Sequence, residues 1–321
     1  MLKHFVSVKQ TRGRMEILSA AVQRIRTKYF KFRYLRAARS VLETEQLAPG
    51  TLPFTIVSMV HKRDVISYLV AAKSFTRYAN PRRVVVVCDP SVDDSDRILF
   101  KRHIPHVELR NAAEFVDSRL PTGGCWERLL AISHYVKTDY VIQLDADTVT
   151  VSFVPEVMEA IETQSGFVLG EKPDQKPMSL IETSEVANSL PYELRHIQDV
   201  AESKMALACA RPEDLYIRGC AGFTGFPSSQ EMNANIVAYS LAMQKLIGAR
   251  WSTWGTEQVT SNYIVANSRN AKILPFPKYC TPDVRNNDTA FLHFIGYCRF
   301  VNAKYERTSK RVIESLKTLS A

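Results

Sequence analysis

Short apolar segments alternate with segments of helical periodicity from residue 54 to residue 144, and this alternation constrains the fold more than any other feature. Segments of strand length occur at Phe54–Val60, Arg83–Cys88, Val107–Leu109 and Tyr140–Leu144. Between them, helices are expected over Val65–Tyr78, Asp93–His103 and Trp126–Val136. Such alternation is typical of an α/β fold with a doubly wound, mostly parallel sheet. Because open sheets of this kind bind ligands beyond the carboxyl ends of their strands, we expect the functional site there.

The pattern is looser after residue 150. Short strands are expected over Gly166–Gly170, Leu215–Arg218, Gly222–Phe226 and Leu292–Ile295. Helices are expected over Asn233–Leu246 and Glu257–Ala266. This half is therefore predicted to contain a smaller mixed sheet that closes the site.

Positive charge is concentrated in the first 40 residues. The chain has 42 Lys and Arg against 33 Asp and Glu, which gives a formal charge of +9. Residues 1–40 hold 11 basic residues and one acidic residue, so this segment carries +10 and residues 41–321 sum to −1. A nucleic-acid-binding domain would be basic over its body, so we expect no nucleic-acid partner.

Residues 15–40 are predicted to form an amphipathic helix. Apolar side chains recur there at three- and four-residue spacing, with Arg and Lys between them. One interpretation is a helix that packs on the body and leaves a solvated basic face. The other is contact with an anionic membrane surface or an acidic partner.

Cysteine spacing and hydropathy indicate the compartment. The six cysteines form no C-x-x-C pair, so a zinc ribbon or a dithiol redox site is not expected. No apolar run approaches the roughly 18 residues of a transmembrane helix, and charges recur where a signal peptide would have its apolar core. We therefore expect reduced, buried thiols and a cytoplasmic location.

Two carboxylates follow directly after the apolar strand Tyr140–Leu144. On an extended segment, Asp145 and Asp147 point the same way because one residue separates them. Unpaired carboxylates are costly to bury, so they need a cation or an exit to solvent. Together they can hold one hard divalent ion and leave positions for water and phosphate oxygens. The sequence predicts a divalent-metal site here; the alternative is a loop with two helix-capping acids.

The same region carries a resemblance to a known family. Arg128-Leu129 on a helix, then a strand, then Leu144-Asp145-Ala146-Asp147-Thr148 resembles the central signature of glycosyltransferases of the A-type nucleotide-sugar fold. The chain looks closest to the group containing glycogenin and the bacterial lipopolysaccharide glucosyl- and galactosyltransferases. The resemblance spans residues 54–300 and implies a Rossmann-like, mostly parallel sheet with a smaller mixed sheet on the acceptor side. It also implies Mn²⁺ or Mg²⁺ and a nucleotide-sugar donor, with a UDP-sugar as the first guess.

The resemblance also implies roles for residues near the C-terminus and around the two acids. His293-Phe294-Ile295-Gly296-Tyr297-Cys298-Arg299 is similar to the family's late His-Phe-x-Gly-x-x-Lys motif. It implies His293 as the third metal ligand beside Asp145 and Asp147, since imidazole suits Mn²⁺. Arg299 would replace the lysine that grips the diphosphate. The donor site would also include Arg128, Ala146, Gly296 and the two acids.

Other segments depart from the family pattern. Glu257-Gln258-Val259 and Asn262 stand where the family has Asp-Gln-Asp and Asn, and Cys220-Ala221-Gly222 lacks the family's asparagine. Glu257 and Gln258 are candidate catalytic residues. The usual acid after the first strand is absent, so Ser58 and Asp89 are the candidates for nucleoside binding.

The resemblance implies a hexosyltransferase that retains the anomeric configuration and acts in bacterial surface polysaccharide or lipopolysaccharide assembly. The expected acceptor is a saccharide or a lipid-linked saccharide, reached at the inner face of the membrane through residues 1–40. One alternative is an inverting enzyme with Glu257 as base. Another is a nucleotidyltransferase, although His61-Lys62-Arg63-Asp64 lacks the glycines of a phosphate loop. A third is a non-catalytic, membrane-associated scaffold.

The expected organisation has four parts. Residues 1–50 would form the basic helical segment and a linker, and residues 51–150 the nucleotide-sugar-binding half. Residues 151–300 would form the acceptor-binding half, which supplies the C-terminal metal ligand. Residues 301–321 would form a C-terminal helix.

Overall fold

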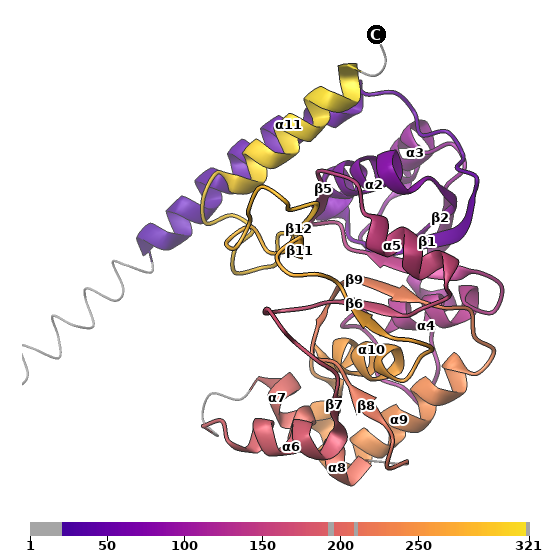
Figure 1. Cartoon of the computed structure of the whole chain (residues 1–321). Helices are drawn as coiled ribbons and strands as arrows, with labels where there is room; N and C mark the ends of the chain where they lie inside the picture. Colours follow the sequence, from indigo (N-terminus) through magenta and orange to yellow (C-terminus); the bar gives the residue numbers. More distant parts are fainter. Residues whose placement is uncertain (1–20, 192–195, 209–210, 319–321) are drawn as a thin grey trace, which may run out of the picture.

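The computed structural model describes residues 21–191, 196–208 and 211–318 (Figure 1). Its centre is a seven-stranded sheet in the order β10-β6-β9-β4-β1-β2-β3. The strands are β1 (Leu52–Val60), β2 (Pro81–Cys88), β3 (Glu108–Asn111), β4 (Tyr140–Leu144), β6 (Phe167–Leu169), β9 (Cys220–Phe226) and β10 (Lys272–Ile273). The run β4-β1-β2-β3 is parallel, whereas β9 is antiparallel to both β4 and β6.

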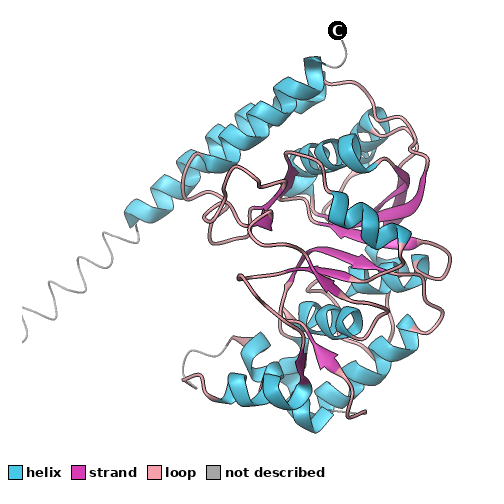
Figure 2. Ribbon diagram, in the orientation of Figure 1, coloured by secondary structure: helices cyan, strands magenta, loops and turns pink. Residues whose placement is uncertain are grey.

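Helices cover both faces of this sheet, as Figure 2 shows by secondary structure. Alternate residues of β2 point to opposite faces, so Val85 and Val87 join one apolar cluster while Val84 and Val86 join another. The helices between the parallel strands are α2 (Val65–Ala79), α3 (Asp94–His103) and α4 (Trp126–Tyr135). The doubly wound α/β arrangement predicted for this half is confirmed.

Local signals in the sequence fix the ends of these helices. Helix α2 ends at Ala79 and is capped by Asn80, which adopts a left-handed conformation (φ 48°). Pro81 comes next, and a proline there cannot continue the helix. Helix α3 begins with a capping box. The Asp93 side chain accepts a hydrogen bond from the Asp96 backbone, and the Asp96 side chain accepts one from the Asp93 backbone. The predicted helix boundaries therefore lie within one or two residues of those observed.

The second half is richer in short elements than the sequence predicts. It contains α5 (Pro155–Glu162), α6 (Leu180–Asn188), α7 (Ile197–Glu202), α8 (Met205–Ala208), α9 (Met232–Ile247), α10 (Thr256–Ala266) and α11 (Lys304–Thr318). Its remaining strands are β5 (Thr148–Thr150), β7 (Met178–Ser179), β8 (Leu215–Tyr216), β11 (Tyr279–Cys280) and β12 (Phe291–His293). Strands β11-β12-β5 form a smaller mixed sheet, in which β12 is parallel to β11 and antiparallel to β5. Of the strands predicted for this half, only the one over Leu292–Ile295 belongs to it. Those over Gly166–Gly170 and Gly222–Phe226 are β6 and β9 of the central sheet, and the one over Leu215–Arg218 is β8, which pairs with β7. Short 3₁₀ turns occur at Arg39–Glu43, Lys62–Asp64, Ala112–Glu114 and Gly248–Ser252.

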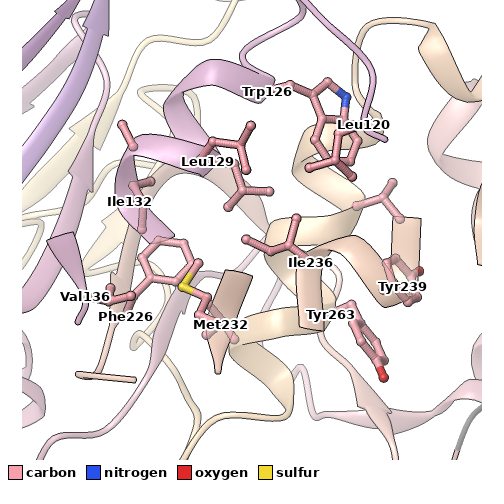
Figure 3. Packing of buried hydrophobic residues seen from close by; sticks show 14 of the residues in the cluster. Leu120, Trp126, Leu129, Ile132, Val136, Phe226, Met232, Ile236, Tyr239 and Tyr263 are labelled. Atoms are coloured by element: carbon pink, nitrogen blue, oxygen red, sulfur yellow. The ribbon is translucent and has the colours of Figure 1, made fainter. Parts of the chain in front are cut away.

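The largest apolar cluster lies under α4, where this helix meets α9 and α10. Figure 3 shows Trp126, Leu129 and Ile132 of α4 on one side of the cluster, with Ile236 and Tyr263 on the other. Because these side chains are buried, they fix α4 and α10 relative to the sheet. Those two helices carry Arg128 and Glu257 into the site.

The predicted N-terminal helix is observed over residues 21–38, and residues 15–20 lie outside the described part of the chain. It runs alongside α11 (Figure 1). The ring of Tyr34 stacks on that of Tyr305 at 3.8 Å between centroids, and Arg33 Nη2 lies 2.8 Å from Glu306 Oε1. Tyr34 and Ala38 are buried, whereas Val22, Ile25, Tyr29 and Phe32 are exposed.

The first sequence-based interpretation, a helix that packs on the body, is confirmed for one face of this segment, and contact with a membrane or an acidic partner stays a prediction. The face around Tyr34 packs on the body, while the stripe of Val22, Ile25, Tyr29 and Phe32 faces solvent. Among the residues that the structure describes, no helix combines the length and the apolar character needed to cross a membrane.

Candidate active site

Three side chains with metal-binding donors meet beyond the carboxyl end of β4. Asp145 and Asp147 follow this strand, and His293 is the last residue of β12. Strand β12 pairs with β5 so that His293 lies opposite Thr148, and the Phe294 backbone donates to Asp147 O at 2.8 Å. One donor atom from each of the three side chains lies within 4.8 Å of the others. The pairing of β5 with β12 thus brings together residues separated by about half the chain.

The donor set fits a divalent cation. His293 Nε2 lies 3.1 Å from Asp147 Oδ1. Two carboxylates with one imidazole fit Mn²⁺ better than Mg²⁺, because Mg²⁺ prefers oxygen ligands and imidazole suits transition metals. The backbone of β9 passes so close to the imidazole that a Cβ on Gly222 would lie 2.0 Å from His293 Cε1. Only glycine therefore leaves the His293 ring in this position. On the other side of the ring, Cys220 Sγ lies 3.2 Å from Nδ1 and holds its orientation.

Charge is balanced tightly around these donors. Burial disfavours the imidazolium, but the Cys220 sulfur and the Asp147 carboxylate outweigh it and hold the pKa of His293 well above its ordinary value. Burial also opposes ionisation of Asp147, but His293 and Arg299 keep the pKa of this carboxyl below its ordinary value. Burial raises the pKa of Asp145 despite its ion pair with Arg128.

Arg128 joins two acids beneath the metal-binding donors. Its Nη1 is paired with Asp145 Oδ1, and its Nη2 lies 3.1 Å from Glu257 Oε2. Both Arg128 and Glu257 are buried, and burial raises the pKa of Glu257 to about 7. Because its two terminal amino groups are engaged with carboxylates, Arg128 fixes Asp145 and Glu257 in place.

Arg299 borders the donors from the opposite side. Its Nη2 lies 2.7 Å from Asp64 Oδ1, and its Nη1 lies 3.7 Å from Asp147 Oδ2. Asp64 belongs to the turn after β1, and it was not among the predicted site residues. It anchors Arg299 close to Asp147.

A pocket of about 170 Å³ opens above the donors. Its wall contains seven predicted site residues, namely Arg128, Asp145, Asp147, Glu257, Gln258, His293 and Gly296. Gln258 is held in place because its Oε1 accepts from the Ala221 backbone at 3.3 Å and its Nε2 donates to Gln198 Oε1 at 3.0 Å.

The wall also contains residues that the sequence did not indicate, among them Trp254 and His196. Trp254 lines the pocket while 68% exposed, and its ring centroid lies 6.1 Å from that of His196. Trp254-Gly255 stands immediately before α10, three residues before Glu257. Trp254 could have been predicted from this position, because an aromatic residue and a glycine stand at the start of the helix that carries the candidate acid Glu257.

Four predicted donor-site residues do not line this pocket. Ser58 is buried in β1, and its Oγ donates to Leu144 O at 2.6 Å. Asp89 follows β2 and lies 3.1 Å from His61 Nδ1. Ala146 packs in an apolar cluster, and Arg299 reaches Asp147 from outside the pocket wall. Nucleoside binding by Ser58 and Asp89 stays a prediction.

Replacing His293 tests the donor set directly. We expect His293→Ala to weaken Mn²⁺ binding at least tenfold, because the variant loses a donor that two partners hold in place. The matched control is His196→Asn, which changes another histidine of the same pocket and keeps a side chain able to cap α7. Calorimetric titration with Mn²⁺ alone measures both affinities. Equal weakening in the two variants, or none in His293→Ala, contradicts the assignment.

Comparison of the sequence with family models and with curated proteins gives no match. Solved structures do match. The glycosyltransferase GlyE of Streptococcus pneumoniae TIGR4 is 10% identical with a TM-score of 0.50, over 84% of this chain and 64% of that chain. The bifunctional glycosyltransferase WbbM is 15% identical with a TM-score of 0.49, over 85% and 53%. An active-site mutant of LgtC is 11% identical with a TM-score of 0.48, over 82% and 96%.

This chain spans about half of the WbbM chain and less than two thirds of the GlyE chain. At so low an identity the likeness to GlyE concerns the fold. The chain has the A-type fold of nucleotide-sugar glycosyltransferases, as the sequence predicted.

Proposed function

We propose that this chain is a metal-dependent glycosyltransferase that moves a sugar from a nucleotide-sugar donor to an acceptor hydroxyl. A UDP-sugar is the first candidate for the donor. The observation that carries the proposal is the cluster of Asp145, Asp147 and His293 at the carboxyl end of the parallel strands in a chain with this fold. A divalent ion held by these three residues would neutralise negative charge on the leaving nucleoside diphosphate.

The arginines have different tasks in this proposal. Arg299 points a guanidinium toward Asp147 from the pocket's edge, where it can bind diphosphate oxygens. Arg128 is a positioning residue, because its terminal amino groups are engaged by Asp145 and Glu257. It holds the Asp145 carboxylate in one orientation and compensates its charge within the protein interior.

We propose retention of the anomeric configuration. Glu257, the base of the inverting alternative, has a pKa of about 7, which is suitable for a general base. Its oxygens, however, both accept from Arg128 Nη2, at 3.2 and 3.1 Å. That pairing favours a structural task for Glu257, whereas retention requires no dedicated base. The anomeric configuration of the product, determined by NMR, separates the two mechanisms.

The acceptor would approach past Trp254. The exposed indole of this residue offers a flat apolar face at the rim of the pocket, on which the C–H face of a sugar ring can stack. A saccharide acceptor is thereby favoured over a small alcohol.

The N-terminal helix supports a lipid-linked acceptor. Val22, Ile25, Tyr29 and Phe32 are between 53% and 69% exposed and lie on one side of the helix. Residues 21–40 hold seven Lys and Arg and no acid. An exposed apolar stripe flanked by basic residues suits an anionic bilayer, to which each basic residue contributes about 1 kcal/mol. We propose that this stripe contacts the inner face of the membrane in surface polysaccharide or lipopolysaccharide assembly.

Donor hydrolysis tests the proposed activity without knowledge of the acceptor. With a panel of nucleotide sugars and Mn²⁺, we expect slow release of the nucleoside diphosphate from one donor, and its loss in EDTA. Asp147→Asn should lower the rate by about 100-fold or more, since preorganised stabilisation of the leaving group is removed. Asp174→Asn, the same change at an exposed acid, should leave the rate unaltered. Divalent-independent release, or none from any donor, argues against the proposal.

Vesicle sedimentation tests the membrane contact. Ile25→Asp/Phe32→Asp should abolish binding to phosphatidylglycerol vesicles, because it places charge in the apolar stripe. The control Ile98→Asp/Val116→Asp changes two exposed apolar residues elsewhere and should bind like the unaltered protein. If both double variants bind equally well, the stripe is not the contact surface.

A further inference from the structure

A second pocket lies between α2, β5 and α11. It encloses about 190 Å³, and its wall shares no residue with the pocket above the metal-binding donors. Arginines from three separate segments line it: Arg77 near the end of α2, Arg285 in the loop before β12, and Arg311 on α11. Among the residues that the structure describes, no Asp or Glu lines this pocket, so the described wall carries three positive charges without a carboxylate among them.

Hydroxyl groups complete the wall. Arg77 Nη1 donates to Ser315 Oγ at 2.6 Å, and Arg285 Nη1 donates to Thr308 Oγ1 at 3.3 Å. These contacts fix two of the guanidinium groups at the wall without neutralising them. Two of the three guanidinium groups are thus held by a neighbouring hydroxyl, and all three are on exposed side chains that can donate to a ligand.

Thr150 supplies an independent observation. It lines the same pocket and is 1% exposed, and its Oγ1 has no hydrogen-bond partner among the described residues. A buried hydroxyl without a partner is destabilising, because the group has lost its water and gained nothing in exchange. A ligand oxygen bound against Thr150 would supply the acceptor that this hydroxyl lacks.

We propose that this pocket binds a phosphoryl group. Guanidinium groups bind phosphate oxygens through paired N–H donors, and three of them from different elements match the several oxygens of a tetrahedral anion better than a planar carboxylate. The buried Thr150 hydroxyl adds a neutral donor at the wall. The site lies outside the proposed catalytic chemistry, so it stands or falls separately from the glycosyltransferase assignment.

Inorganic phosphate tests the site in the full-length protein. Calorimetric titration is performed in EDTA, so that no divalent ion draws phosphate to Asp145 and Asp147. Arg77→Gln/Arg311→Gln should weaken phosphate binding at least tenfold. Arg102→Gln, an exposed arginine on α3 that does not line the pocket, should bind phosphate like the unaltered protein.

A second variant separates ligand binding from a purely structural role. Thr150→Val keeps the shape of the side chain and removes the unpartnered hydroxyl, so the melting temperature without phosphate should stay equal or rise. We expect phosphate affinity to fall severalfold all the same. Absence of phosphate binding, or affinities unchanged in Arg77→Gln/Arg311→Gln and in Thr150→Val, overturns the proposal.

Two further probes distinguish the source of the phosphoryl group. If it belongs to a soluble ester, glycerol 3-phosphate should bind more tightly than inorganic phosphate, and Arg77→Gln/Arg311→Gln should not alter binding to phosphatidic acid vesicles. If it belongs to a lipid headgroup, the same double variant should lose vesicle binding at least tenfold. If the variant changes neither glycerol 3-phosphate binding nor vesicle binding, the pocket has no phosphoryl ligand.

Discussion

The arrangement of this protein depends on carboxylates placed at the end of a buried strand. Asp145 and Asp147 leave the sheet partly buried, with 26% and 17% of their side chains exposed, so the protein compensates much of their charge. Arg128 compensates Asp145, while His293 and Arg299 compensate Asp147. Removal of any one of these partners would leave the negative charge of a partly buried carboxylate less well compensated.

That requirement ties distant parts of the chain together. Arg128 comes from α4, His293 from β12, and Arg299 from the segment beyond it, where Asp64 anchors it from the turn after β1. Even the backbone of β9 is adapted to the site, because the His293 ring occupies the space that a side chain at position 222 would need. The same contacts that hold the fold together therefore preorganise the metal-binding donors.

The sequence was sufficient for the first half of the fold and for the grouping of Asp145, Asp147 and His293. The parallel strands and their helices each carry a long periodic pattern of apolar residues. Asp145, Asp147 and His293 lie in short motifs that can be recognised in the sequence, and they meet in the structure. Helices such as α7 have too few turns for periodicity to reveal them. Arg128 was expected at the diphosphate, but its ion pair with Glu257 depends on the packing of α4 against α10. No local pattern encodes that packing.

Two other residues show where sequence reasoning is limited. Ser58 lies in a strand that is buried on both faces, so alternation could not reveal the surroundings of its side chain. Its hydroxyl donates to the Leu144 backbone, and its role in nucleoside binding stays a prediction. In the N-terminal helix the apolar stripe was visible, but the packing face is set by Tyr34 and Ala38, which stand among basic residues. Only the tertiary contact with Tyr305 distinguishes that face.

Manganese anomalous scattering tests the central claim most directly. Crystals of the unaltered protein grown with Mn²⁺ and UDP should give one strong anomalous peak within about 2.3 Å of the donor atoms of Asp145, Asp147 and His293, with the diphosphate beside it. A peak coordinated by other side chains, or UDP bound with no peak between these three residues, would contradict the account.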